Sequence, residues 1–140
     1  MRHYPLPMHP DAGPAARAMQ AAKRQGKAWE MADILFANYR KLKPDDIAGY
    51  AGELSLDVEK FKTVFESDEV AKEVAGDTKA ASRAGVRGTP TILVNGLKHR
   101  GPRTLEGFKP VIDGEIKKAD ALIKKGTPLA KVYEALSKSK

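Results

Sequence analysis

The sequence predicts a mostly helical chain with a single β-hairpin, and three observations support that fold class. Apolar residues recur at helical spacing over most of the 140 residues. One β-rich run, at 91–94, is followed at once by Asn95-Gly96, which is the strongest short-range hairpin signal. No apolar run approaches the ~20 residues of a transmembrane helix, so we expect no membrane insertion. The length suits one ordinary domain.

The composition excludes several kinds of site. The 140 residues contain no cysteine, which excludes a thiolate nucleophile, a redox dithiol, a disulfide and a Cys-ligated metal within them. Lys and Arg outnumber Asp and Glu by 25 to 18, and +6 of the +7 net charge lies in residues 97–140. This basic tail raises the possibility of a nucleic acid or an anionic surface as a partner. Its lysines follow a helical pattern without interleaved aromatic residues, which favours a solvated helix surface instead.

The first third of the chain predicts an irregular opening and two helices. The prolines before residue 15 each remove a backbone donor and restrict the preceding residue, which predicts extended, irregular backbone. Small residues share one face of a helix over 15–22, and Gly26 is expected to stop it. A second helix is expected over 29–39. Its apolar stripe, which we expect in the core, consists of Trp29, Ala32, Leu35, Phe36 and Tyr39.

Start signals predict the next three helices. Pro44, followed by two acidic residues, suits the first turn of a helix. Asp57 is expected to cap a helix over 58–65, and Ser67 to cap a longer one that runs to about Ala84. Gly85 is expected to close that helix.

The hairpin and two further helices complete the inventory of about seven helices. Strands are expected over 91–94 and 97–100, joined by a type I′ turn. Thr104 is expected to cap a helix that Gly126 ends, and Thr127-Pro128 to start the last one. The expected apolar face of the longer helix consists of Leu105, Phe108, Ile112, Ile116, Ala119 and Ile123. An isolated hairpin is marginal in water, so further strands or covering helices are expected.

Three stretches resemble one family. Residues 85–96, Gly-Val-Arg-Gly-Thr-Pro-Thr-Ile-Leu-Val-Asn-Gly, resemble the cis-proline loop and following hairpin of thioredoxin-fold proteins, specifically the DsbA-like thiol-disulfide oxidoreductases. Residues 25–36, Gln-Gly-Lys-Ala-Trp-Glu-Met-Ala-Asp-Ile-Leu-Phe, resemble that family's helical insertion, although the family often has His where Ala32 stands. Residues 2–10 resemble the end of the fold's second strand. The stretches occur in the family's order, and the resemblance covers nearly the whole chain.

The resemblance implies an α/β, thioredoxin-like fold of DsbA type with a helical insertion. Residues 1–10 would be a remnant of the second strand and the loop that leads into the helices. Residues 11–84 would be the helical insertion, and residues 85–140 the cis-proline loop, the hairpin and the C-terminal helices. Family members begin with a strand and a Cys-x-x-Cys, and this chain starts after them. A shortened chain, a start codon assigned too far downstream and a natural fragment all stay open.

The resemblance also implies a substrate-binding loop. In the family, the backbone of the residue before the proline pairs with an extended substrate peptide. Thr89 and Pro90 would take these places, with Arg87 and Gly88 shaping the approach. A cis Thr89–Pro90 bond is expected, and the alternative is a trans proline that leads into an edge strand.

Other candidate residues give weaker evidence for a functional site. The three histidines, His3, His9 and His99, lack metal-ligand spacing and are expected to be surface or packing residues. Glu30 and Asp33 are expected on a solvated helix face beside Lys27. We expect no catalytic residue, no cofactor and no metal in this chain.

Three functions follow as hypotheses. The first is a thiol-disulfide oxidoreductase by family that is redox-inactive as given, so that enzymatic activity stays open; the resemblance implies the periplasm, and residues 1–5 do not suggest a signal peptide. The second is a non-catalytic module that binds a peptide or protein, or that forms a homodimer through an exposed sheet edge. The third, a basic helical protein that binds nucleic acid, is the least favoured.

Overall fold

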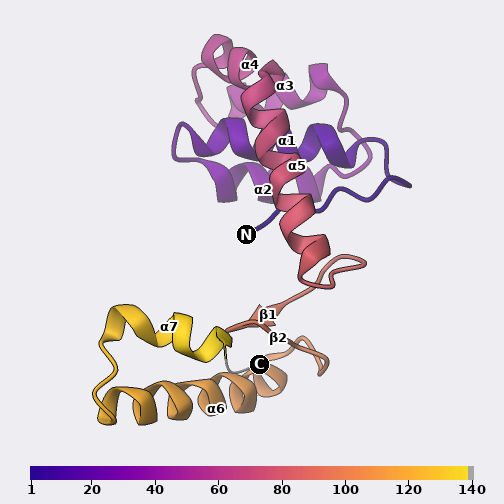
Figure 1. The fold of residues 1–140 in the computed structure, drawn as a ribbon. Coiled ribbons are helices and arrows are strands. Elements are labelled where there is room, and N and C mark those ends of the chain that lie inside the picture. The colour runs from indigo at the N-terminus through magenta and orange to yellow at the C-terminus, as the bar shows by residue number, and fades with distance from the viewer. Residues whose placement is uncertain (139–140) are drawn as a thin grey trace. The chain divides into compact units, whose positions relative to one another are not determined.

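The computed structural model describes residues 1–138 and contains, within them, seven helices and one antiparallel hairpin (Figure 1). This confirms the element types expected from the sequence. The chain divides into two compact units, Met1–Thr89 and Pro90–Lys140. The elements are α1 (Ala12–Lys23), α2 (Ala28–Ala37), α3 (Pro44–Glu53), α4 (Val58–Glu66), α5 (Asp68–Arg83), β1 (Leu93–Val94), β2 (Leu97–Lys98), α6 (Leu105–Lys124) and α7 (Leu129–Lys138).

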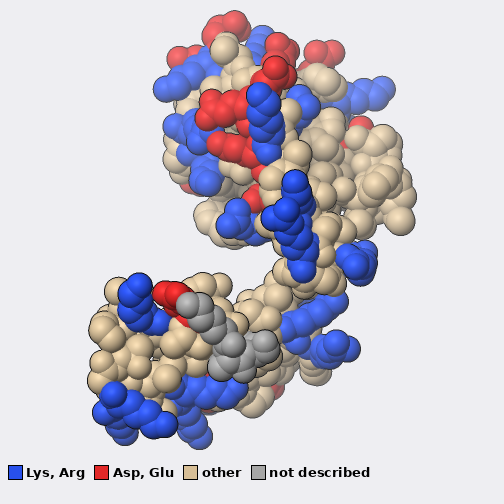
Figure 2. All heavy atoms as spheres, in the orientation of Figure 1, with Lys and Arg blue, Asp and Glu red and all other residues tan. Residues whose placement is uncertain are grey.

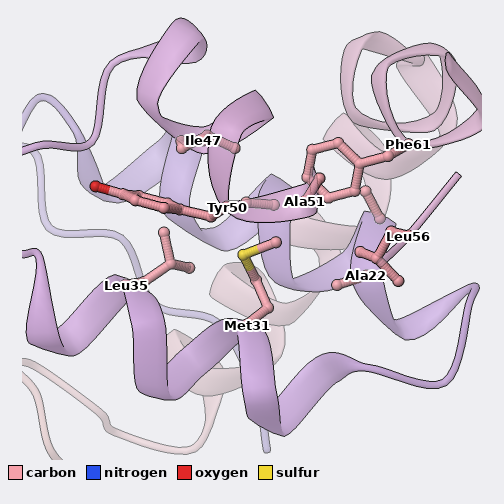
Figure 3. Close-up of a cluster of buried hydrophobic side chains, with 10 residues drawn as sticks. Ala22, Met31, Leu35, Ile47, Tyr50, Ala51, Leu56 and Phe61 are labelled. Carbon is pink, nitrogen blue, oxygen red and sulfur yellow. The ribbon is translucent and has the colours of Figure 1, made fainter. Parts of the chain in front are cut away.

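The first unit is built around the small-residue face of α1. Ala18, Ala21 and Ala22 are completely buried, so α1 is close-packed with the helices around it, as their sizes predict. Side chains from the neighbouring helices and one loop pack against these alanines (Figure 3). They are Met31 and Leu35 from α2, Ile47, Tyr50 and Ala51 from α3, Leu56 from the following loop, and Phe61 from α4.

The predicted core stripe on α2 is wrong for its aromatic residues. Trp29 is 66% exposed, Phe36 77% and Tyr39 62%. The helix instead buries Met31 and Leu35, together with Ala32. Two apolar faces of similar strength lie on this helix. The buried one carries the flexible Met31, which fits the close-packed alanine face of α1.

Most helix ends agree with the start signals. The Asp57 carboxylate accepts from the N–H of Lys60 at 2.9 Å, and the Ser67 hydroxyl accepts from the N–H of Val70 at 3.3 Å. Thr104 caps α6 by accepting from the N–H of Gly107 at 3.2 Å. These three predictions are confirmed, because a cap depends only on residues within one turn.

The second unit contains the hairpin, with Leu93 opposite Lys98 and Val94 opposite Leu97. Asn95 and Gly96 have φ of +47° and +85°, as a type I′ turn requires, so the predicted turn is confirmed. Both strands are shorter than the predicted 91–94 and 97–100. One further bond, from the N–H of His99 to the carbonyl of Ile92 at 2.9 Å, extends the pairing before the chain turns at Gly101-Pro102.

The predicted buried face of α6 is also partly wrong. Four of its residues are exposed in the described structure: Leu105, Ile112, Ile116 and Ile123. The helix instead buries Glu115, whose carboxylate lies 2.7 Å from Lys118 Nζ and 3.4 Å from Asn95 Nδ2. Because Glu115 accepts a hydrogen bond from the hairpin turn, the buried face of α6 is rotated toward that turn.

Candidate functional site

The four residues that the sequence predicts as a binding loop follow one another directly after α5. Arg87, Thr89 and Pro90 are exposed, and Gly88 is half-buried. Within the described residues, no hydrogen bond is made by the backbone N–H or carbonyl of Thr89. The loop therefore presents an unpaired backbone at the position where the resemblance expects a peptide to pair. The division between the two units falls between Thr89 and Pro90.

The first unit fixes the start of this loop. Val86 is buried, and its N–H donates to the carbonyl of Ala81 at 3.0 Å. The Tyr4 hydroxyl donates to the Val86 carbonyl at 3.2 Å, and Arg87 Nη1 donates to the same carbonyl at 3.3 Å. The last carbonyl before the loop thus accepts from Tyr4, which lies 82 positions earlier, and from Arg87, the next residue along the chain.

Tyr4 is held in place because the opening segment is fixed to α5. Asp77 on α5 is 7% exposed, and its carboxylate accepts from Arg2 Nη1 at 2.7 Å and from the backbone N–H of His3 at 3.0 Å. Burial raises the pKa of Asp77, but these hydrogen bonds outweigh burial and the pKa lies below its ordinary value. Burial also lowers the pKa of His3, against the opposing effect of Asp77.

The second unit fixes the other end of the loop. Arg103 Nη2 donates to the carbonyl of Pro90 at 3.0 Å. The turn that carries Arg103 is tightly folded: His99 Nε2 lies 2.9 Å from the Pro102 carbonyl, and the centroid of its ring lies 4.3 Å from that of Phe108, with the rings tilted by 31°. A Cβ on Gly107 would lie 2.1 Å from the Pro102 oxygen, so only glycine fits there. Arg103 is thereby positioned on Pro90.

The hairpin, which lies in the second unit, offers a backbone edge of its own. Leu93 and Lys98 form the non-hydrogen-bonded pair of the ladder, so the backbone N–H and carbonyl of Leu93 are directed away from β2. Such an edge is a template for an added strand. The chain therefore continues from the unpaired Thr89 into a strand with a free outer edge.

Sequence reasoning missed Arg103, Tyr4 and Asp77. Each acts on a residue that is between 13 and 82 positions away, and no local pattern marks such a partner. The Gly101-Pro102 turn was a signal that the chain returns after β2, but it did not show where Arg103 would bind.

Residues 1–138 contain neither a cluster of possible metal ligands nor a helix that could span a membrane. No three His, Asp or Glu side chains gather in these residues as a metal would require. No helix in the same residues is both long and apolar enough to cross a membrane.

The helices of the first unit precede a Gly-Thr-Pro loop and a hairpin, which is the order that the resemblance to the family predicts. The family model described as the DSBA-like thioredoxin domain matches residues 2–113, so the chain belongs to this family. The match includes the opening segment, all five helices of the first unit, the loop and the hairpin.

Curated relatives match most of the chain. The chain is 41% identical over 112 residues to the Na(+)/H(+) antiporter NhaA 3 of Salinispora tropica, which covers 79% of this chain and 17% of that protein. It is 41% identical over 101 residues to the Na(+)/H(+) antiporter NhaA of Herminiimonas arsenicoxydans, with 72% and 16% covered. The chain spans about a sixth of the length of these relatives, and the name antiporter belongs to those whole proteins. No solved structure matches the chain.

Proposed function

We propose that this chain is a peptide-binding part of a DsbA-like domain and that it holds an extended segment of a partner protein against the Arg87–Pro90 loop. The observation that supports the proposal is the unpaired Thr89 backbone, which follows the Val86 carbonyl that Tyr4 and Arg87 bind. An exposed, unpaired backbone suits strand addition, because its N–H and carbonyl can pair with an extended peptide.

We propose that these 140 residues do not exchange disulfides by themselves. The reaction requires a thiolate that attacks a disulfide sulfur and a second thiol that resolves the mixed disulfide. No cysteine is present in the sequence, and the hydroxyl or imidazole of Ser, Thr or His cannot substitute for sulfur in this exchange. In an insulin-reduction assay, the rate with the chain is therefore expected to equal that of the dithiol reagent alone. The periplasm, the usual compartment of the family, is the location we propose.

Two substitutions at one position test the binding proposal. Thr89→Pro removes the backbone N–H that would pair with a peptide, whereas Thr89→Ala removes the side chain and keeps the N–H. We expect Thr89→Pro to weaken binding of an extended, fluorescein-labelled peptide by about tenfold or more, as the loss of a paired backbone hydrogen bond predicts. Thr89→Ala is expected to bind within about twofold of the unchanged chain.

Fluorescence anisotropy gives both affinities, and a thermal melt of each variant checks that it folds. Equal peptide affinity of a folded Thr89→Pro and the unchanged chain would contradict pairing at this residue. Absence of binding by the unchanged chain would contradict the proposal as a whole.

We also propose that two copies associate through the outer edge of β1. The observation that favours this is the exposed Leu93, whose backbone is directed away from β2. Two such edges can pair with each other when no peptide occupies them.

A further inference from the structure

The segment that contains the loop is free of acidic residues. Between Asp77 and Glu106, the 28 residues 78–105 include six Lys and Arg but no Asp or Glu. The average density of the chain, 18 acidic residues in 140, would place about four there. The basic residues are Lys79, Arg83, Arg87, Lys98, Arg100 and Arg103.

These six side chains are exposed and, among the described residues, none forms an ion pair with a carboxylate. Basic residues elsewhere do find acidic partners, as Arg24 does with Glu69 and Glu73 between α1 and α5. Figure 2 shows blue side chains that follow one another along the chain after the end of α5, with no red side chain among them. The positive charge of this segment is therefore uncompensated.

The charges lie close to the proposed pairing backbone along the chain. Arg87 precedes Thr89 by two residues, and Arg103 donates directly to the Pro90 carbonyl. Lys98 stands opposite Leu93 in the hairpin, and Arg100 follows two residues later. The Arg87 side chain is long enough to reach a strand paired beside the loop, whereas Lys98 lies on β2, away from the outer edge of β1, and acts through the field of its charge.

We propose that the peptides held by this loop are acidic. The inference rests on the proposed function, since it names the class of peptide that the same site prefers. Carboxylates on an extended peptide would meet uncompensated cations that precede and follow Thr89 in the sequence, which raises affinity and association rate. A nucleic acid would meet the same charges. The segment 78–105, however, contains no Phe, Tyr or Trp on which bases could stack, and the unpaired Thr89 backbone suits a peptide.

Three peptides of equal length and apolar pattern provide the test, with Glu, Gln or Lys at the same four alternate positions. A single-stranded oligonucleotide of the same net charge as the Glu peptide is the fourth probe. At 50 mM NaCl we expect the Glu peptide to bind about tenfold more tightly than the Gln peptide, and the Lys peptide to bind most weakly. We expect the difference to shrink at 500 mM NaCl, where exposed charges are screened.

The outcomes separate the inference from the proposal beneath it. Equal affinity for the Glu and Gln peptides overturns the acidic preference and leaves peptide binding standing. Absence of binding by every peptide overturns the proposed function itself. Tighter binding of the oligonucleotide than of the Glu peptide overturns the inference in favour of a nucleic acid.

A pair of matched double variants adds a second readout. Lys98→Gln with Arg100→Gln removes two charges in this segment, and Lys41→Gln with Lys60→Gln removes two exposed charges in the first unit. We expect the first pair to weaken binding of the Glu peptide about fivefold without changing that of the Gln peptide. The second pair is expected to stay within twofold for both. If both double variants lost the same affinity for the Glu peptide, the effect would depend on net charge alone, and a preference set by the residues near the loop would be overturned.

Discussion

Single residues hold the start of the loop, and Asp77 holds the opening segment that carries one of them. Its buried carboxylate binds two successive residues of the opening segment, which in turn positions Tyr4 on the Val86 carbonyl. Because the partners are 74 and 75 positions away, the sequence alone could not indicate this contact. The caps Asp57, Ser67 and Thr104 were predictable, since each binds a backbone N–H three residues ahead.

We expect Asp77→Asn to destabilise the first unit by about 1–3 kcal/mol at pH 7, since a neutral amide replaces a buried carboxylate that accepts two hydrogen bonds. The folded pKa of Asp77 lies below its ordinary value of 3.8, so its stabilisation is present above that value and is lost as the pH falls below it toward the folded pKa. The difference in unfolding free energy between the variant and the unchanged chain should therefore narrow as the pH falls below 3.8.

Urea unfolding at a series of pH values measures this difference. Asp33→Asn is the control, because Asp33 is exposed on α2. A destabilisation by Asp77→Asn that stays constant as the pH falls well below 3.8 would show that the negative charge of Asp77 does not stabilise the fold.

At the level of elements, the helix ends, the turn and the buried face of α1 were predictable, and the buried faces of α2 and α6 were not. On α2 the sequence offers two apolar faces, and the one that packs is chosen by the alanine surface of α1, which belongs to another part of the chain. On α6, the same ambiguity is resolved by Glu115 and the hairpin turn. The strands were predicted too long, because β-propensity at 91–94 does not reveal how much of the run finds a partner.

The close approach at the start of α6 gives a prediction with an internal control. Gly107→Ala would place a methyl group 2.1 Å from the Pro102 carbonyl oxygen, so the backbone must shift and we expect a loss of about 1–3 kcal/mol. Gly114→Ala in the same helix meets nothing within 4 Å, and its helix propensity should add up to about 1 kcal/mol.

Thermal unfolding followed by circular dichroism compares the two variants. Opposite signs are expected. A stabilising Gly107→Ala would show that the turn carrying Arg103 is not tightly folded.

The outer edge of β1 gives a prediction about the association of two copies. We expect the unchanged chain to elute partly as a dimer at high concentration, and Leu93→Lys to shift it toward the monomer, because a charged side chain on an edge strand opposes pairing. Leu129→Lys, an equally drastic change at an exposed site outside the hairpin, should leave the equilibrium unchanged. Light scattering after size-exclusion chromatography reports the masses, and a monomer at every concentration would contradict association through this edge.

At the scale of the whole molecule, the family was recognisable from three short stretches, and the match over residues 2–113 confirms it. The three-part division into 1–10, 11–84 and 85–140 stays a prediction. The structure separates the chain once, between Thr89 and Pro90, inside the loop that the resemblance assigned to substrate binding. Residues 87–90 were identifiable because the Gly-Thr-Pro sequence is local. The side chains that bind the residues on either side of the loop were not predictable, because Tyr4 and Arg103 lie 82 and 13 positions from their partners in the sequence.

The central claim is that an extended peptide pairs with the backbone around Thr89. An amide-resolved NMR titration with the unlabelled Glu peptide tests it most directly. Binding at the loop predicts that the largest shifts fall on the N–H signals of Gly88 and Thr89. The main alternative surface is the exposed aromatic face of α2, which Trp29 reports through its indole N–H. Shifts concentrated at Trp29 and Phe36, with the loop signals unmoved, would contradict the claim.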